Sequence, residues 1–108
     1  MKKTFTGEDA LSAVQPIFDS LTPNEQRVQL EAERAHRTRM ALAIAIHRAR
    51  SEAGITQNQL SDLSGVPQQE ISRLEKAKGN PTVLTLTKIG SVLNLQLGYA
   101  PDTLPQVN

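Results

Sequence analysis

The sequence predicts an all-α protein, and three features of the chain support this fold class. Aromatic residues make up only 3% of the 108 residues, so the core must be built from aliphatic side chains, which suits small helices better than a β-sandwich. Apolar residues recur at spacings of three and four along most of the chain, as on one face of a helix. Two short segments of this kind are joined by a tight glycine-containing turn around Gly65, which is typical of a helix-turn-helix motif.

Length, charge and cysteine content narrow the class of protein further. The length fits one ordinary domain, and the absence of cysteine excludes a disulfide framework and a thiolate zinc site. The longest apolar run, residues 40–46, is too short to cross a membrane, and no apolar stretch follows the first two lysines, as a signal peptide would require. We therefore expect no membrane partner and a cytoplasmic location.

The net charge of +1 hides an uneven distribution along the chain. Residues 1–33 hold three basic and six acidic side chains, a balance of −3, whereas residues 34–108 hold nine basic and five acidic ones, a balance of +4. A basic C-terminal part favours a polyanionic partner.

The N-terminal third predicts one amphipathic helix followed by a second helix start. Residues 8–21 carry an apolar stripe interrupted by Pro16, which kinks or splits a helix. The stripe consists of Leu11, Val14, Ile17, Phe18 and Leu21. Thr22 and Glu25 have the spacing of a capping box, and nothing then stops a helix before Gly54. This long stretch predicts either one helix or two helices that meet near residues 36–40.

The C-terminal half predicts three short helices and one strand. The first begins after Thr56 and ends at Gly65, the second lies between Pro67 and Gly79, and the third runs from a cap at Thr82 to a left-handed stop at Asn94. Residues 93–99 then alternate between apolar and other side chains, as in a strand. Because a lone strand is unstable, we expect it to pair with a second copy of the chain. The expected dimerisation residues are Leu95, Leu97 and Tyr99.

The spacing within the two central helices separates a packing face from a polar face. Leu60, Val66, Ile71 and Leu74 fall where a helix-turn-helix unit needs inward side chains. The same spacing leaves a set of polar residues facing outward from the second helix: Gln68, Gln69, Ser72, Arg73 and Lys76. Glutamine pairs well with adenine and arginine with guanine in the major groove, so this face is predicted to read bases. The alternative is an ordinary solvated surface.

Residues 54–93 resemble the Cro/C1-type (XRE) helix-turn-helix family, and the pattern covers roughly residues 40–94. The resemblance rests on Thr-Gln at the start of the first helix, Gly-Val in the turn and Ile-Ser-Arg-x-Glu in the second helix. It implies a lambda-repressor-like helical bundle that binds DNA, with Gln57 at the helix start touching phosphate or capping, and a buried ion pair between Arg50 and Glu75. Lys76 and Lys78, together with Arg48, are expected to add phosphate contacts. Two positions depart from the family: Ser61 is often alanine, and Pro67 usually is a capping serine or threonine.

The layout of the whole chain resembles antitoxins of bacterial type II toxin–antitoxin operons, of the HigA or HipB type. The resemblance implies a helical extension at residues 1–39 that binds toxin, a DNA-binding domain at 40–94 and a dimerising strand and tail at 95–108. It implies a homodimer that represses its own operon at a palindromic operator and neutralises a toxin, either a small ribonuclease or a kinase-like protein. It also implies a nucleoid-associated location in a bacterium. The apolar stripe of the extension binds the toxin or packs on its own dimer. The alternative is a stand-alone phage-like repressor.

No motif in the sequence predicts catalysis. Glu33 and His36 have the spacing of a di-iron helix, but such sites need a second copy of the motif, and the chain has only two histidines. Neither a glycine-rich phosphate loop nor a nucleophile–base motif is present. We expect no enzyme activity, no cofactor and no metal.

Overall fold

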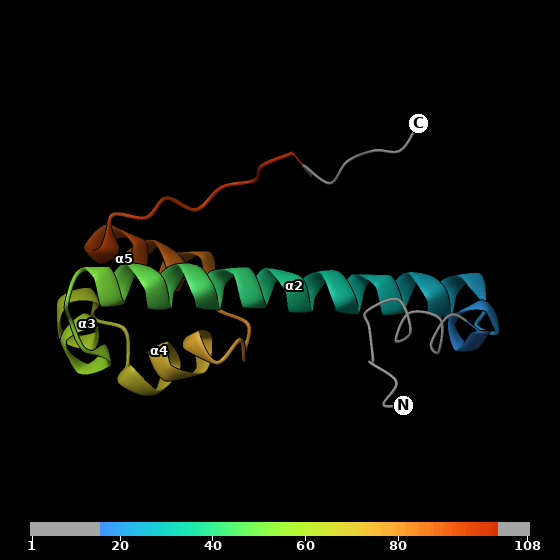
Figure 1. Cartoon of the computed structure of the whole chain (residues 1–108), viewed down its shortest axis with the longest axis horizontal. Helices are drawn as coiled ribbons and strands as arrows, with labels where there is room; N and C mark the ends of the chain where they lie inside the picture. Colours follow the sequence, from blue (N-terminus) through green and yellow to red (C-terminus); the bar gives the residue numbers. More distant parts are fainter. Residues whose placement is uncertain (1–15, 102–108) are drawn as a thin grey trace, which may run out of the picture. The chain divides into compact units, whose positions relative to one another are not determined.

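A computed structural model describes residues 16–101 of the chain (Figure 1). In order along the chain, α2 spans Pro23–Glu52, α3 Gln57–Ser64, α4 Gln68–Glu75 and α5 Val83–Leu93, and residues 16–19 are also helical. The chain divides into two compact units, Met1–Thr38 and Arg39–Asn108, with the boundary inside α2.

The first unit contains the predicted helix start at Thr22. The Thr22 amide donates to Glu25 Oε1 at 2.8 Å, and the Glu25 amide donates to Thr22 Oγ1 at 3.2 Å, which completes the capping box. The Gln26 side chain donates back to the carbonyl of Phe18 at 3.1 Å, which ties the preceding turn to α2. Because residues 24–53 contain neither glycine nor proline, nothing breaks the helix, and the alternative of one continuous helix is correct.

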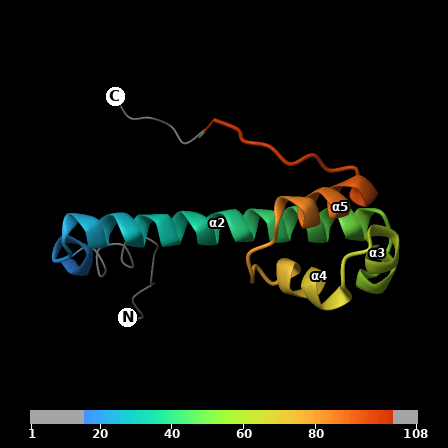
Figure 2. The same ribbon diagram turned by 180° about the vertical axis from the view of Figure 1, so that it is seen from behind.

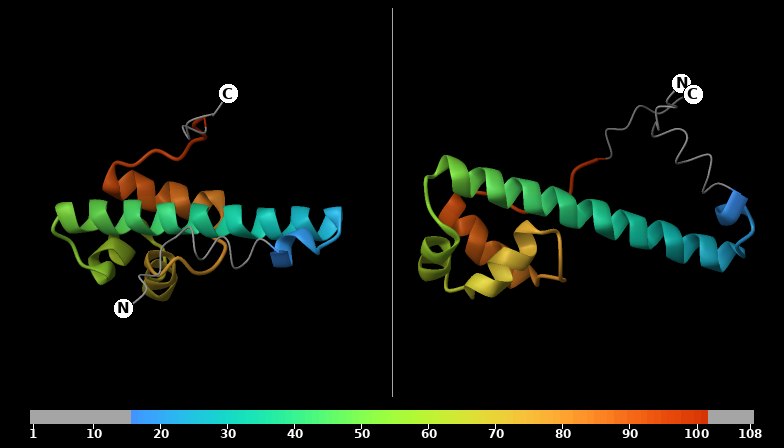
Figure 3. Two further views of the ribbon diagram at one scale, coloured as in Figure 1. Left: turned by 45° about the vertical axis from the view of Figure 1, so that its right-hand side comes forward. Right: turned by 60° about the horizontal axis from the view of Figure 1, so that its bottom comes forward.

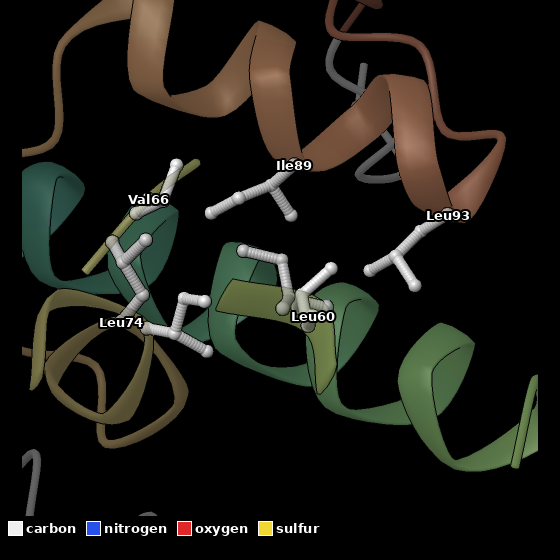
Figure 4. Close-up of a cluster of buried hydrophobic side chains, with 7 residues drawn as sticks. Leu60, Val66, Leu74, Ile89 and Leu93 are labelled. Atoms are coloured by element: carbon white, nitrogen blue, oxygen red, sulfur yellow. The ribbon is translucent and has the colours of Figure 1, made fainter. Parts of the chain in front are cut away.

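The second unit packs α3, α4 and α5 around residues 39–52 of α2 (Figures 2 and 3). One cluster of buried side chains joins all four helices, and five of its members are labelled in Figure 4. The cluster consists of Ile46, Leu60, Val66, Ile71, Leu74, Ile89 and Leu93. Leu60, Ile71 and Ile89 are fully buried, and burial of each contributes about 2 kcal/mol to stability. The inward positions expected of the helix-turn-helix unit are therefore buried together.

The turn between α3 and α4 is held by local hydrogen bonds. Gly65 ends α3 in the left-handed region, at φ 77° and ψ 8°, where a side chain is disfavoured. The hydroxyl of Ser61 donates to the carbonyl of Val66 at 2.6 Å, and the Val66 amide donates to Ser64 Oγ at 3.2 Å. The serine that departs from the family pattern thus supplies a hydrogen bond to the turn where alanine could not.

The end of α5 confirms the predicted stop, and no strand is seen after it among the described residues. Asn94 adopts the left-handed conformation, at φ 58° and ψ 41°, and the Leu95 amide donates to the carbonyl of Gly90 at 2.9 Å. Residues 95–101 follow as a single segment outside helix and strand (Figure 1). The strand predicted at 93–99 is not seen in the single chain: residue 93 belongs to α5, and no other segment among residues 16–101 lies beside residues 95–101 in a ladder. The pairing with a second copy of the chain, which a strand needs, stays a prediction.

Candidate nucleic-acid interface

The face of α4 opposite the core presents polar side chains to solvent. Ile71 and Leu74 are buried, whereas Gln69, Arg73 and Lys76 are exposed, as a helical period of 3.6 residues requires of positions on opposite faces. Gln68 and Ser72 lie at the edge of this face and are half-buried. The five residues expected to face outward from α4 therefore lie on its exposed side or at the edge of that side.

The first residue of α4 is positioned by α3. Pro67 precedes the helix and makes no side-chain capping hydrogen bond, as its lack of a polar group dictates. The Gln68 side chain instead donates from Nε2 to Oε1 of Gln57 at 2.9 Å, which links the first residues of α4 and α3. Gln57 is itself set by the helix start, where Thr56 and Gln59 form a capping box. The direction of Gln68 is thus fixed by a neighbouring helix and not by a cap.

Basic side chains border the polar face without acidic partners. Among the described residues, no carboxylate lies within ion-pair distance of Arg73, Lys76 or Lys78. The carboxylate of Glu70 accepts a hydrogen bond from the Thr85 hydroxyl of α5 at 3.3 Å. A hollow of about 450 Å³ beside α4 is lined in part by Gln69, Arg73 and Lys78. The surface is polar and carries a surplus of positive charge, since Arg73 and Lys78 face the single carboxylate of Glu70 in the hollow, which suits contact with phosphates and base edges.

An ion pair between α2 and α4 holds the polar face in place. Arg50 donates from Nε to Oε2 of Glu75 and from Nη2 to Oε1, both at 2.8 Å, and from Nη1 to the carbonyl of Ile55 at 2.9 Å. His47 Nδ1 lies 2.8 Å from Glu75 Oε1. The pair expected between Arg50 and Glu75 is therefore present in bidentate form, with side-chain exposures of 15% and 5%.

The protonation of this pair follows from its surroundings. Burial disfavours the charged carboxylate of Glu75, but its hydrogen bonds to Arg50 and His47 outweigh burial, so the pKa of Glu75 lies below its ordinary value. The hydrogen bonds from Arg50 to Glu75 raise the pKa of the guanidinium. Both groups are charged at neutral pH, and α4 is anchored to α2 by a fixed ion pair.

Comparisons with known proteins agree with this geometry. The helix-turn-helix family pattern matches residues 46–99. A Haemophilus influenzae protein described as an uncharacterized HTH-type transcriptional regulator is 35% identical over 92 residues, which cover 84% of this chain and 94% of the relative. The chain belongs to the Cro/C1-type (XRE) helix-turn-helix family. The uncharacterized HTH-type transcriptional regulator y4dJ of Sinorhizobium fredii is 42% identical over 48 residues, 44% of this chain and 62% of the relative.

Membership of the helix-turn-helix family assigns α3 and α4 their roles in the motif. The two helices of the motif are α3 and α4, joined at Gly65, and α4 is the second, recognition helix. Gln68 and Gln69 lie in the first turn of α4, the part of a recognition helix that approaches DNA bases. Arg73 lies one turn further along the helix. Its guanidinium is in van der Waals range of Gly79, since a Cβ built on that glycine would lie 3.8 Å from Arg73 Nε.

The residues expected to bind a toxin or to dimerise lie elsewhere. Leu11 and Val14 fall outside the described residues, whereas Ile17 is 66% exposed and Phe18 and Leu21 are half-buried in the first unit. Leu95, Leu97 and Tyr99 follow α5, and all three are exposed. The described residues contain no helix long and apolar enough to span a bilayer.

Sequence reasoning missed one contact at this surface. Arg39, from α2, donates from Nη1 to Oδ1 of Asn80, in the loop after α4, at 3.4 Å. The two residues are 41 positions apart, and neither belongs to a motif. Only the fold shows that a third basic residue from another helix reaches the loop beside Arg73 and Lys78.

Proposed function

We propose that the chain is a sequence-specific DNA-binding transcriptional repressor that acts as a homodimer on a palindromic operator. The observation that carries the proposal is the exposed face of α4, where Gln69 and Arg73 stand clear of the core and Gln68 is held by Gln57. The names of the two relatives, both HTH-type transcriptional regulators, support the same function.

The chemistry of the face fits major-groove recognition. A glutamine amide makes a bidentate pair with adenine and a guanidinium one with guanine, and each pair contributes about 1–3 kcal/mol of discrimination. Gln69 and Arg73 are one helical turn apart on α4, so both face the same groove. Lys76 and Lys78 lie at the C-terminal end of the helix and in the following loop, where they contact phosphates and not bases. Two such helices in a dimer address half-sites about 34–36 Å apart.

Removal of one base-reading side chain tests this role. Operator sequences are selected from a random duplex library with the full chain, and binding of the selected duplex and of a shuffled duplex is measured by fluorescence anisotropy. Gln69→Ala weakens binding to the selected duplex and leaves binding to the shuffled duplex nearly unchanged. Gln29→Ala, which removes an exposed glutamine from the first unit, serves as the matched control. An equal loss on both duplexes for Gln69→Ala rejects the base-reading role.

The extended segment after α5 supports dimerisation. Leu95 and Leu97 are exposed apolar side chains, and the backbone of residues 95–101 carries no ladder, so a second copy of the segment can pair with it. We propose that this pairing joins two chains. Leu97→Glu then shifts the chain toward monomer in sedimentation, whereas Gln96→Glu, on the other face of the segment, does not. A dimer that withstands Leu97→Glu places the dimer interface elsewhere.

The first unit supports a second role, that of an antitoxin that binds a toxin and represses its own operon. Ile17 is an exposed apolar side chain at 66%, and residues 1–33 carry a balance of −3, which steers a basic partner. In a full-length chain, Ile17→Glu weakens co-purification with the protein encoded beside this gene, whereas Ser20→Glu leaves it intact. A stand-alone repressor has no such partner, and the absence of any co-purifying neighbour favours that alternative.

A further inference from the structure

The α4–α5 loop, together with α2, forms a basic surface that α4 alone does not explain. The loop between α4 and α5 is linked to α2 by the hydrogen bond from Arg39 to Asn80. Its start is closed by two backbone hydrogen bonds, from Ala77 to the carbonyl of Leu74 at 3.0 Å and from Lys78 to that of Arg73 at 2.9 Å. The loop therefore has a defined conformation that brings Asn80 to α2.

Arg39 meets this loop through one hydrogen bond to an uncharged group. Its Nη1 donates to Asn80 Oδ1 at 3.4 Å, and no carboxylate among the described residues lies within ion-pair distance of its guanidinium. A neutral amide orients the guanidinium without cancelling its charge. The remaining donors of Arg39 are left for an anion, since an arginine carries five N–H groups.

The anion-binding groups around the loop come from three elements. The hollow beside α4 is lined by Gln69, Arg73, Lys78 and Asn80, and Arg39 adds a cation from α2 at its Asn80 side. The one acidic residue that lines the hollow, Glu70, has an oxygen engaged by the Thr85 hydroxyl. Three cations, Arg73, Lys78 and Arg39, therefore face one carboxylate, that of Glu70, around this hollow and loop, which leaves a positive balance from α4 to α2.

We propose that Arg39, oriented by Asn80, binds a backbone phosphate of the DNA that α4 reads and so extends the interface onto α2. The inference rests on the proposed DNA-binding function and adds a residue and a helix to its contact surface. A phosphate beside the groove is reached by the guanidinium in the bidentate geometry that arginine favours. Arg39 is a phosphate-contacting residue and carries no base preference.

Salt dependence of DNA binding measures this contact. The logarithm of the association constant falls with the logarithm of salt concentration with a slope of about −0.9 per neutralised phosphate. Arg39→Ala in the full chain therefore makes the slope shallower by about 0.9 for each chain bound. Between 50 and 200 mM salt, the loss of DNA affinity of this variant is then about 3.5-fold smaller, for each chain bound, than the loss of the wild type. The loss is similar on the selected and the shuffled duplex, because phosphates carry no sequence.

Arg27→Ala is the matched control. Arg27 lies on the same helix and also donates to an asparagine, Asn24 Oδ1, at 2.8 Å, but that asparagine belongs to α2 itself. Both variants remove one positive charge, so a slope change in Arg39→Ala alone identifies a contact and not a general charge effect. Asn80→Ala, which keeps the charge of Arg39 and removes only its orienting group, shows a smaller reduction in slope. Phosphate-ethylation interference locates the contact. Ethylation of one phosphate in each half-site weakens binding of the wild type and has no effect on binding of Arg39→Ala.

The outcomes separate this inference from the function on which it rests. A wild-type chain that does not prefer its selected duplex overturns both. A wild-type chain that binds specifically, with equal slopes for Arg39→Ala and Arg27→Ala, overturns the phosphate contact alone. A drop in melting temperature of Arg39→Ala with an unchanged slope and an unchanged ethylation pattern also overturns it, because the link to Asn80 then only stabilises the fold.

Discussion

Breaking the ion pair between Arg50 and Glu75 is expected to destabilise the domain more than removing both partners. Glu75→Ala strips Arg50 of two of its four hydrogen-bond contacts, from Nε and Nη2 to the carboxylate, each 2.8 Å long. It leaves the bond from Nη1 to the carbonyl of Ile55 at 2.9 Å and the contact between Nη2 and His47 Nδ1 at 3.4 Å. The guanidinium remains in a site where its side chain is 15% exposed. Loss of one partner of a buried pair costs about 3–5 kcal/mol. Because water reaches the edge of Arg50, we expect about 2–3 kcal/mol.

The double variant supplies the comparison. Arg50→Met combined with Glu75→Leu removes both charges and fills similar volume with apolar groups, which is often nearly neutral for stability. We expect its free energy of unfolding to lie within about 1 kcal/mol of the wild type. His47→Ala, which removes a 62% exposed partner of Glu75, is the control and costs about 0.5 kcal/mol or less.

Urea denaturation followed by circular dichroism at the helix band measures these differences, since the chain has no tryptophan for fluorescence. The reasoning is refuted if Glu75→Ala loses less than about 1 kcal/mol, as an exposed pair would. It is equally refuted if the double variant is less stable than Glu75→Ala, since the cost would then not arise from a stranded charge.

Three further predictions follow from the backbone and from the pKa of Glu75. Gly90→Ala places a Cβ 2.5 Å from the carbonyl oxygen of Leu95. The resulting clash outweighs the higher helix propensity of alanine, and we expect a loss of about 1 kcal/mol in the free energy of unfolding; a rise in the urea midpoint contradicts this. Ala77→Gly raises stability by about 0.5–1 kcal/mol, since Ala77 has a φ of 58°, whereas Gly65→Ala, at 77°, lowers it. The lowered pKa of Glu75 contributes stability that is fully present above its ordinary value of 4.5 and is lost as the pH falls through the folded pKa. Acid titration of the melting temperature therefore shows a drop below pH 4.5 that Glu75→Gln reduces, and an identical drop in that variant contradicts the assignment.

The parts of the fold that depend on local spacing could be predicted from the sequence. The capping box of Thr22 needs only neighbouring residues, as does the cap of α3 at Thr56. The left-handed stop at Asn94 follows from the short polar side chain that tolerates that conformation. The inward positions of α3 and α4 follow from their period. The strand expected after α5 is not seen in the single chain, because a strand forms only beside a partner and a period of two says nothing about where that partner is.

The parts of the site that join distant residues could not be predicted from the residues themselves. The hydrogen bond from Gln68 to Gln57 crosses between helices, and that from Arg39 to Asn80 joins residues 41 positions apart. The pair of Arg50 and Glu75 was expected only through the family resemblance. The sequence leaves both one helix and two open for residues 23–53, because the composition changes near 36–40. Such a change does not by itself break a helix, and no glycine or proline among residues 24–53 supplies a break.

The most direct test of the account is the binding of the full chain to its selected duplex and to a shuffled duplex at one fixed, near-physiological salt concentration, with wild type and Gln69→Ala side by side. The account predicts that the wild type prefers the selected duplex by about 10³-fold or more. It predicts that Gln69→Ala lowers this ratio by about 5- to 150-fold per reading helix, the equivalent of 1–3 kcal/mol. A wild-type chain that binds the two duplexes equally, or a ratio that Gln69→Ala leaves unchanged, contradicts the claim that α4 reads DNA sequence.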